Sequence, residues 1–196
     1  MSSRQAALWI DGASFTRVSG AAYDVDVAGA APISQQPYRK SPAEAAKCEA
    51  HISKNLAMGL LTRHVGAWAT PAFVVPQASK PNGRLVCDYR RVNAVTRRMY
   101  YPIPRVDDTL RRCAGRRWLS SLDAVSGFNH LPLTPRAREI LAICTFSGLY
   151  AWESLPFGPC DGPQAFQAVM RRVFDGYAAD WLAIYIDDLC IASGAA

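Results

Sequence analysis

What this sequence lacks excludes several classes of protein. No apolar run approaches the roughly 20 residues that a membrane-spanning helix needs, and the stretch from Trp181 to Ile186 is typical of the longest. The N-terminus has no signal-peptide core, because Asp11 and Arg17 interrupt it. The six cysteines include no Cys-x-x-Cys pair, and the three histidines have no metal-ligand spacing. We therefore expect no membrane partner, no secretion, no zinc site, and cysteines that stay reduced inside the cell.

Length and composition indicate a folded domain. Half of the 196 residues are hydrophobic, which is ample for one medium domain or two small ones with a true core. Charged residues make up 19% of the chain and aromatic residues 10%, so a disordered polyelectrolyte is excluded.

Positive charge is concentrated in the middle of the chain. Residues 80–117 carry 11 basic and 3 acidic groups, whereas residues 118–196 carry 4 basic and 8 acidic groups. A basic block beside an acidic half fits a polyanion track that leads to a cation-binding site. On charge alone, an arginine-rich solvated surface is an equally good interpretation.

The local patterns alternate between helix and strand, as is typical of an α+β domain. Ser41-Pro42-Ala43-Glu44 is a capping box with proline at the first helical position, which predicts a helix from there to about Leu61. Pro81-Asn82-Gly83 is expected to join two strands, and Asp187-Asp188 to form the tip of a final hairpin. Further helices are expected at 106–113 and 162–176, and strands at 72–76, 84–89, 118–123, 140–146, 149–155, 181–186 and 189–192.

Carboxylates follow two of the expected strands. Asp123 ends one apolar strand, and Asp187 and Asp188 follow another. Adjacent carboxylates repel each other unless a cation compensates, and a third carboxylate would complete an oxygen-rich site suited to Mg²⁺. Two such ions about 3.5–4 Å apart support nucleotidyl transfer, because they activate a hydroxyl and stabilise the leaving pyrophosphate. For an isolated Tyr-x-Asp-Asp, a polar hairpin turn without metal is the simpler interpretation.

Several further segments change that balance, because they occur in one order and at one spacing. Together they resemble the reverse transcriptases of gypsy-type LTR retrotransposon polyproteins, over about residues 24–192. The segments are the fingers motif Arg84–Asn93, the stretch Pro102–Leu110, the first palm carboxylate motif Ser121–Phe128, the Leu-Pro-Phe-Gly segment Leu155–Gly158 with its helix at Pro163–Gln167, and Tyr185–Asp188.

The resemblance implies an α+β fold of the right-hand polymerase type, with an antiparallel palm sheet and packed helices. Because the chain stops eight residues after Asp188, we expect fingers and a partial palm, with thumb, connection region and ribonuclease H absent. The expected parts are an N-terminal extension at 1–35 that is weakly ordered or docked, fingers at 36–97 and 131–155, and a partial palm at 98–130 and 156–196.

The resemblance also implies roles for individual residues. Asp123, Asp187 and Asp188 match the catalytic carboxylates; with the Ala124 carbonyl they would hold two Mg²⁺ ions, for which Mn²⁺ can substitute. Guanidinium and ammonium groups suit triphosphate oxygens, and a bulky ring at Phe128 would exclude a ribose 2′-hydroxyl. The residues expected at the incoming dNTP are Lys80, Arg84, Ala124, Ser126, Gly127, Phe128, Phe157 and Gly158.

The sequence leaves some of these residues with two interpretations. Lys80 and Arg84 also fit ordinary surface cations, and Phe128 also fits a core phenylalanine. Asp88 and Arg90 form either a structural ion pair or a template contact. The segment Pro159–Pro163 departs from the family's Leu-Thr-Asn-Ala-Pro, which puts the geometry of this loop in doubt.

The function implied by the resemblance is RNA-directed DNA polymerisation, from dNTP to a primer 3′-hydroxyl on an RNA or DNA template. The expected setting is the cytoplasm, within a retrotransposon particle, or the nucleus, in association with the remaining polyprotein domains. The missing thumb makes activity of this chain on its own doubtful. The alternative is therefore an inactive retroelement remnant that folds and binds nucleic acid without polymerising. An unrelated metal-dependent phosphohydrolase would require the fingers motif to be a coincidence.

Overall fold

The computed structural model describes residues 16–78, 80–175 and 181–195. The chain forms two compact units: unit 1 comprises Met1–Arg97 and Phe128–Cys160, and unit 2 comprises Arg98–Gly127 and Asp161–Ala196. Their assignment to fingers and palm stays a prediction. In the described ranges, no helix is long and apolar enough to cross a membrane.

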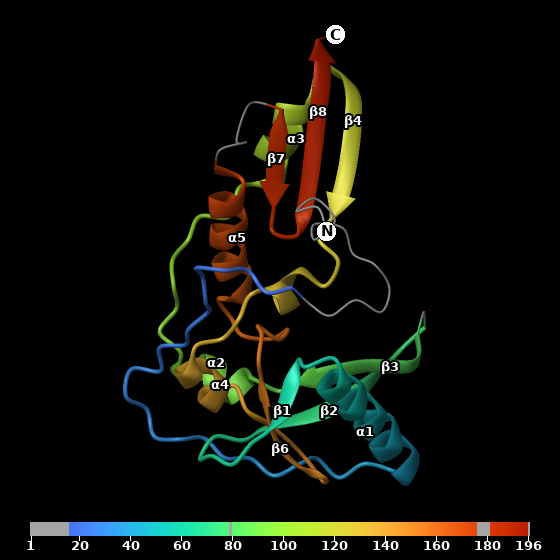
Figure 1. Cartoon of the computed structure of the whole chain (residues 1–196), viewed down its shortest axis with the longest axis vertical. Helices are drawn as coiled ribbons and strands as arrows, with labels where there is room; N and C mark the ends of the chain where they lie inside the picture. The colour runs from blue at the N-terminus through green and yellow to red at the C-terminus, as the bar shows by residue number, and fades with distance from the viewer. Residues whose placement is uncertain (1–15, 79, 176–180, 196) are drawn as a thin grey trace. The chain divides into compact units, whose positions relative to one another are not determined.

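Unit 1 is built on a five-stranded mixed sheet with strand order β1-β6-β5-β2-β3 (Figure 1). β2 and β5 pair in parallel, and all other neighbours are antiparallel. Helix α1 packs against β2 and β3. The elements are α1 (Pro42–Ala57), β1 (Leu61–Arg63), β2 (Thr70–Gln77), β3 (Lys80–Cys87), α2 (Arg90–Val95), α4 (Pro135–Ile140), β5 (Ile143–Thr145) and β6 (Gly148–Trp152).

The predicted start of α1 is confirmed at its capping box. The Ser41 hydroxyl accepts a hydrogen bond from the Glu44 N–H at 3.3 Å, and the Glu44 carboxylate accepts one from the Ser41 N–H at 3.0 Å. The helix ends at Ala57 rather than near Leu61, because Gly59 adopts a φ of 67° and the chain then enters β1.

The turn predicted at Pro81-Asn82-Gly83 is wrong, because these residues lie inside β3. The pairing of β2 with β3 is irregular between Val75 and Gln77, so this stretch of β3 forms a bulge. Gly83 has a φ of 67°, and a Cβ there would lie 2.5 Å from the Val75 carbonyl oxygen. Glycine therefore permits the bulge, and proline is tolerated at such a break in the ladder.

The strand predicted at 140–146 is shorter than expected. Helix α4 occupies the residues up to Ile140, and β5 begins only at Ile143. The Thr134 hydroxyl caps this helix by accepting a hydrogen bond from the Ala137 N–H at 3.1 Å, and proline occupies its first turn. The capping threonine and the proline that begin this helix are visible in the sequence, but the apolar residues that follow them favour a strand.

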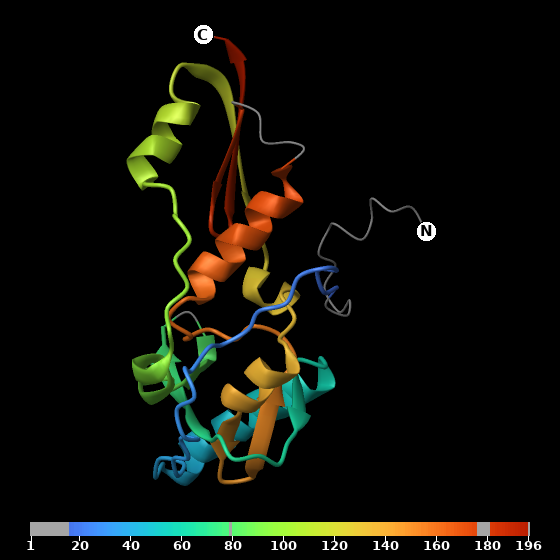
Figure 2. The ribbon, with the colours of Figure 1, turned by 90° about the vertical axis from the view of Figure 1, so that its left-hand side faces the viewer.

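Unit 2 is built on an antiparallel sheet with strand order β4-β8-β7. Helices α3 and α5 pack against β7, and Figure 2 shows α3 along one face of the sheet. The helix expected at 106–113 is confirmed, as is the α+β organisation. The elements are α3 (Val106–Cys113), β4 (Arg116–Asp123), α5 (Gly162–Val173), β7 (Leu182–Tyr185) and β8 (Asp188–Ala195). A 3-10 turn at Gly127–His130 begins at the last residue of this unit's first stretch and continues into unit 1.

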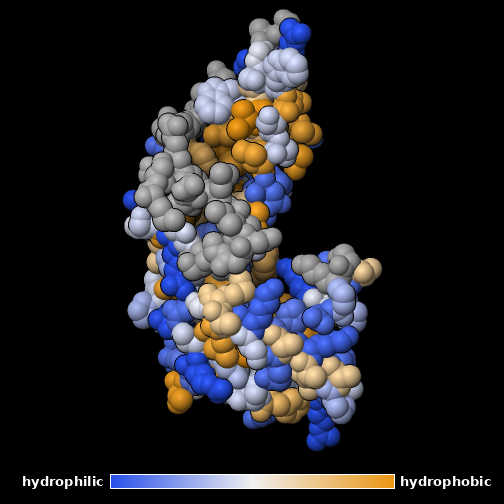
Figure 3. Space-filling view, turned by 45° about the vertical axis from the view of Figure 1, so that its right-hand side comes forward, coloured by the Kyte–Doolittle hydropathy of each residue, from blue (hydrophilic) through white to orange (hydrophobic). Residues whose placement is uncertain are grey.

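Strand β4 exposes its side chains along its whole length. Its large apolar residues Trp118, Leu119 and Leu122 are each more than half exposed. Figure 3 shows apolar residues gathered over this end of unit 2. Within the described ranges, β4 thus forms an uncovered edge of the sheet.

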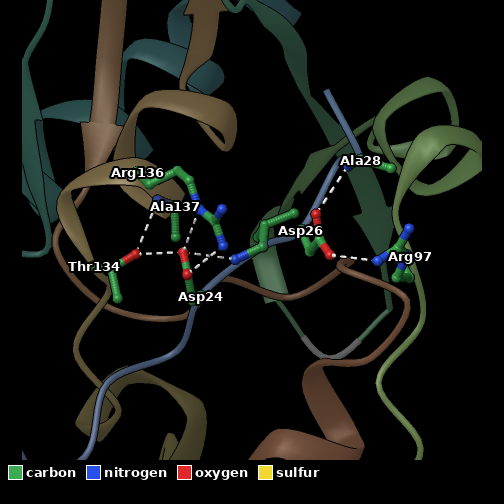
Figure 4. Close-up of polar contacts among 8 residues, drawn as sticks. Asp24, Asp26, Ala28, Arg97, Thr134, Arg136 and Ala137 are labelled. Carbon is green, nitrogen blue, oxygen red and sulfur yellow. Dashed lines mark hydrogen bonds and ion pairs between the residues drawn. The ribbon is translucent and has the colours of Figure 1, made fainter. Parts of the chain in front are cut away.

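The segment before α1 packs against the rest of unit 1 (Figure 4). Tyr23 and Val25 are buried, while Asp24 pairs with Arg136 and Asp26 with Arg97. Burial opposes ionisation of Asp24, but hydrogen bonds from Arg136 and a neighbouring threonine outweigh it and lower its pKa. The segment is therefore docked, which is one of the two states that the sequence left open: side chains 23–26 are alternately buried and paired, and the Tyr23 and Gln35 N–H groups donate to the carbonyl oxygens of Pro132 and Ala69. Residues 1–15 lie outside the described residues.

Candidate functional site

The β7–β8 hairpin has a two-residue tip. Tyr185 pairs with Asp188 across the turn, so Ile186 and Asp187 form the loop and Asp188 is the first residue of β8. The tip predicted at Asp187-Asp188 is therefore shifted by one residue. The shift separates the two adjacent carboxylates, with Asp187 on the turn and Asp188 in the ladder.

Strand β4 brings the third predicted carboxylate to this hairpin. Asp123, its last residue, lies directly opposite Asp188 in the β4–β8 pairing. The next residue, Ala124, donates its N–H to the Asp187 carbonyl oxygen at 2.9 Å. Side chains directly opposite on adjacent strands lie on the same face of a sheet. The three carboxylate residues predicted from sequence thus belong to one hydrogen-bonded region of unit 2.

The donor set of this region fits a hard divalent cation. Asp123 and Asp188 are exposed and Asp187 is half-buried, so these carboxylates remain accessible from solvent. In the described part of the chain, no group of at least three His, Cys, Asp or Glu side chains forms a ready-made metal cage. Mg²⁺ does not need one, because it commonly binds one or two carboxylates and keeps water and phosphate ligands.

The backbone is strained at two turns beside the carboxylates. Ile186 has a φ of 55° and Ser126 a φ of 51°, values that side chains with a Cβ rarely adopt. Strain of this kind persists only where surrounding contacts enforce it, and it concentrates at functional sites.

Gly127 follows the second of these turns and leaves no room for a side chain. A Cβ at Gly127 would lie 2.7 Å from the Phe166 ring, and the Gly127 N–H donates to the Ala124 carbonyl oxygen at 2.9 Å. The amide of Gly127, a residue expected at the incoming dNTP, is therefore already hydrogen-bonded. The Ala124 oxygen retains a second lone pair for a cation.

Arg84 and two phenylalanines cluster in unit 1. The Arg84 guanidinium lies 4.6 Å from the centre of the Phe157 ring, and the Phe157 and Phe128 ring centres are 5.0 Å apart. Arg84 and Phe157 are exposed and Phe128 is half-buried. The structure therefore brings together three residues that the sequence assigned to the nucleotide. Lys80 lies in β3 opposite Gln77, and its side chain is outside the described part.

Asn93 holds the loop that carries Phe157, a role that the sequence left ambiguous. Its side-chain NH₂ donates to the Gly158 carbonyl oxygen at 3.0 Å, and its side-chain oxygen accepts the Cys160 N–H at 3.0 Å. Gly158 has a φ of 122°, and a Cβ there would lie 2.8 Å from the Tyr89 ring. Glycine is therefore required at this position.

Asp88 and Arg90 form an ion pair, which is one of the two interpretations that the sequence left open. Arg90 Nε and one terminal nitrogen donate to the two Asp88 oxygens at 2.7 and 2.6 Å, and the Tyr38 hydroxyl donates to Asp88 at 2.5 Å. The hydrogen bonds from Arg90, reinforced by Tyr38, hold the pKa of Asp88 far below its ordinary value despite burial. Asp88 correspondingly raises the pKa of Tyr38.

Sequence reasoning gave no role to Gln167, whose side chain reaches the β7–β8 hairpin. This residue of α5 is fully buried, and its amide oxygen accepts the Ile186 N–H at 2.6 Å. A polar residue among the apolar positions of α5 was the only available signal, and such a residue also fits an ordinary satisfied core position.

The comparisons with known proteins agree with this architecture. Residues 75–195 match the family described as reverse transcriptase (RNA-dependent DNA polymerase). The chain is 31% identical over 165 residues to the retrovirus-related Pol polyprotein from transposon 412 of Drosophila melanogaster, covering 82% of this chain and 13% of that protein. It is 35% identical over 129 residues to a putative enzymatic polyprotein of Cassava vein mosaic virus, covering 64% of this chain and 20% of that protein.

Solved structures show the same fold. The foamy viral protease-reverse transcriptase in complex with dsDNA has a TM-score of 0.79 at 22% identity, covering 93% of this chain and 38% of that one. The protease-reverse transcriptase of prototype foamy virus has a TM-score of 0.74 at 25% identity, covering 88% and 23%. The chain thus spans less than half the length of each of these relatives. The predicted resemblance and right-hand polymerase fold are confirmed, and the chain belongs to the reverse transcriptase (RNA-dependent DNA polymerase) family.

Proposed function

We propose that this chain carries nucleotide-addition residues of an RNA-directed DNA polymerase, transferring a nucleotide from a dNTP to a primer 3′-hydroxyl on an RNA or DNA template. The observation that carries the proposal is the pairing of Asp123 with Asp188 beside the Asp187 turn. Carboxylates held opposite each other repel, and divalent cations relieve that repulsion.

Two Mg²⁺ ions, or Mn²⁺ in their place, are the proposed cofactors. Asp123, Asp187 and the Ala124 carbonyl would hold them most directly, while Asp188 adds negative charge from the ladder. When bound, such ions lower the pKa of the attacking hydroxyl and stabilise charge on the leaving pyrophosphate. The chain's own contribution is to fix the donors on a sheet edge and a tight turn.

The Arg84–Phe157–Phe128 cluster of unit 1 is the proposed source of nucleotide contacts from that unit. The ring under Arg84 restrains its guanidinium while leaving N–H groups to face solvent and donate to triphosphate oxygens. Phe128, packed on Phe157, would close the sugar position against a 2′-hydroxyl. Lys80, Ser126, Gly127 and Gly158 complete the proposed dNTP contacts, with the Gly127 amide engaged as described above.

The basic segment 80–117 is proposed to follow the nucleic-acid backbone. Phosphate contacts from arginine position a duplex without reading its sequence. Foamy viral protease-reverse transcriptase has been solved in complex with RNA/DNA hybrid and with dsDNA, which supports this choice of partner. Association with other polyprotein domains, in a cytoplasmic particle or the nucleus, belongs to the same proposal.

Primer extension on an RNA template tests the proposal. With Mg²⁺ present, we expect the wild-type chain to extend the primer and Asp187→Asn to lose at least 100-fold in rate, because one metal-holding charge is removed. Asp175→Asn, at an exposed carboxylate just after α5, is the matched control and keeps the wild-type rate. If the wild type and Asp187→Asn are equally inactive while both bind duplex, the inactive-remnant alternative replaces this function.

A further inference from the structure

The side chain of Gln167 is hydrogen-bonded to the backbone of the carboxylate hairpin at two points. Its amide oxygen accepts the Ile186 N–H at 2.6 Å, and its NH₂ group donates to the Ile184 carbonyl oxygen at 3.4 Å. The first partner is a donor and the second an acceptor, so the backbone dictates the orientation of the amide. The side chain is fully buried, so water does not compete for these bonds.

The bond to Ile186 is made at the turn, where the β7–β8 ladder supplies no hydrogen-bond partner. Ile186 is the first residue of the two-residue tip, so its N–H points away from the ladder between Tyr185 and Asp188. Its φ of 55° is also rare for a β-branched residue. The Gln167 amide oxygen accepts that N–H in this conformation of the turn. Because Asp187 is the next residue, the same bond restrains the backbone that carries its carboxylate.

The residue before Gln167 contacts the other carboxylate-bearing segment. Phe166, also buried in α5, lies against Gly127, which ends the turn that follows Asp123. One helix therefore touches both strained turns of unit 2. A helix is a rigid support, and support of this kind fixes the residues of a site to within fractions of an ångström.

We propose that Gln167 is a positioning residue that holds the Ile186 turn and thereby sets the place of Asp187 relative to Asp123. The effect of this role on catalysis rests on the proposed function, whereas its effect on the turn does not. Gln167 touches neither metal nor substrate in this scheme, and acts only through the hairpin backbone.

The first test measures amide hydrogen exchange. In the wild-type chain, the Ile186 amide is expected to exchange at least 10-fold more slowly than an exposed turn amide. In Gln167→Met, which keeps the length but removes both bonds, we expect that protection to disappear while the Leu189 amide in the β7–β8 ladder stays within twofold. Gln164→Met, on the same helix, is the matched control, because the Gln164 side-chain oxygen accepts no hydrogen bond from the described residues. An unprotected Ile186 in the wild type, or unchanged protection in Gln167→Met, overturns the proposal.

The second test measures the site itself. Mn²⁺ affinity, followed by electron paramagnetic resonance, should fall at least 10-fold in Gln167→Met and stay within twofold in Gln164→Met. In primer extension, kcat per folded chain, with the folded fraction taken from the melting curve of each variant, should fall while the KM for dNTP stays within threefold. Equal Mn²⁺ affinity in the wild type and Gln167→Met contradicts the role.

Different results would contradict the proposed function and the role of Gln167. A wild-type chain that does not polymerise contradicts the proposed function, while exchange at Ile186 and Mn²⁺ affinity still decide the role of Gln167. If Gln167→Met loses its cooperative melting transition, Gln167→Asn, which retains an amide one methylene too short, takes its place. If that variant also fails to fold, the wild-type exchange rate of Ile186 alone decides.

Discussion

At the scale of single residues, aromatic packing explains how an exposed arginine is kept in place for a ligand. Arg84 lies over Phe157, which in turn packs on Phe128. A free arginine would lose rotamer entropy on meeting a triphosphate, whereas a side chain already stacked on a ring loses less. The sequence suggested all three residues for the nucleotide but did not predict that they contact one another.

Replacing Arg84 with lysine should weaken dNTP binding. Lysine carries the same charge but neither stacks as a planar group nor forks two phosphate oxygens. We expect the KM for dNTP to rise about tenfold, equivalent to ~1.4 kcal/mol, with primer–template affinity unchanged. Arg63→Lys is the matched control, since Arg63 also lies over a ring, that of Tyr150 at 6.0 Å. Steady-state primer extension measures both, and an equal rise in KM for the two variants contradicts the prediction.

At the scale of elements, one buried carboxylate ties three parts of unit 1 together. Asp88 follows β3, Arg90 is the first residue of α2, and Tyr38 belongs to the segment that precedes α1. Tyr38 and Asp88 meet although they lie 50 positions apart in the sequence. Their hydrogen bonds fix where the fingers motif leaves the sheet.

The stability of the chain should depend on pH through Asp88. Its pKa is lowered in the folded state by Arg90 and Tyr38, so its stabilising effect is fully present above the unfolded-state pKa of about 3.9 and is lost as pH falls below that value. We expect Asp88→Asn to cost about 1 kcal/mol near neutral pH, a small value because solvent screens the exposed Arg90. Urea unfolding at several pH values measures the difference, which should shrink in acid. A difference that stays constant below about pH 3 contradicts the assignment.

At the scale of the whole molecule, charge is divided along the chain in the way that the proposed function needs. The basic segment 80–117 includes strand β3, helix α3 and the start of β4, and the acidic part that follows holds all three carboxylates of the site. Electrostatic binding of this kind is strong at low salt and does not depend on base sequence.

The salt dependence of duplex binding should therefore decrease in proportion to the arginines removed. Replacing Arg98, Arg105 and Arg116 with glutamine should reduce the slope of log K against log salt by roughly 1 to 3, because each phosphate contact contributes about 0.9. The matched control replaces Arg39, Lys54 and Arg63, which lie outside segment 80–117 and change net charge equally. Fluorescence anisotropy at several salt concentrations measures the slope. Equal losses in both triple variants would show that net charge alone is responsible.

The sequence by itself determined whatever depends on neighbours a few residues apart. The capping box of α1, the helix at 106–113 and the order of the carboxylate motifs follow from local patterns. The family also followed from the sequence, because its motifs are short and keep a common order. Local signals failed where the register of a hairpin did not follow its turn-forming residues, as at the Pro81-Asn82-Gly83 bulge and the one-residue shift of the hairpin tip.

Only the tertiary structure decided which distant groups meet. The parallel pairing of β2 with β5, the grip of Asn93 on the Gly158 loop and the bond from Gln167 to Ile186 each join segments that no local pattern connects. The physical reason is that a buried N–H or carbonyl must find a partner, and which partner it finds depends on how the whole chain packs. The sequence therefore specified the reactive groups, and packing decided how they are held.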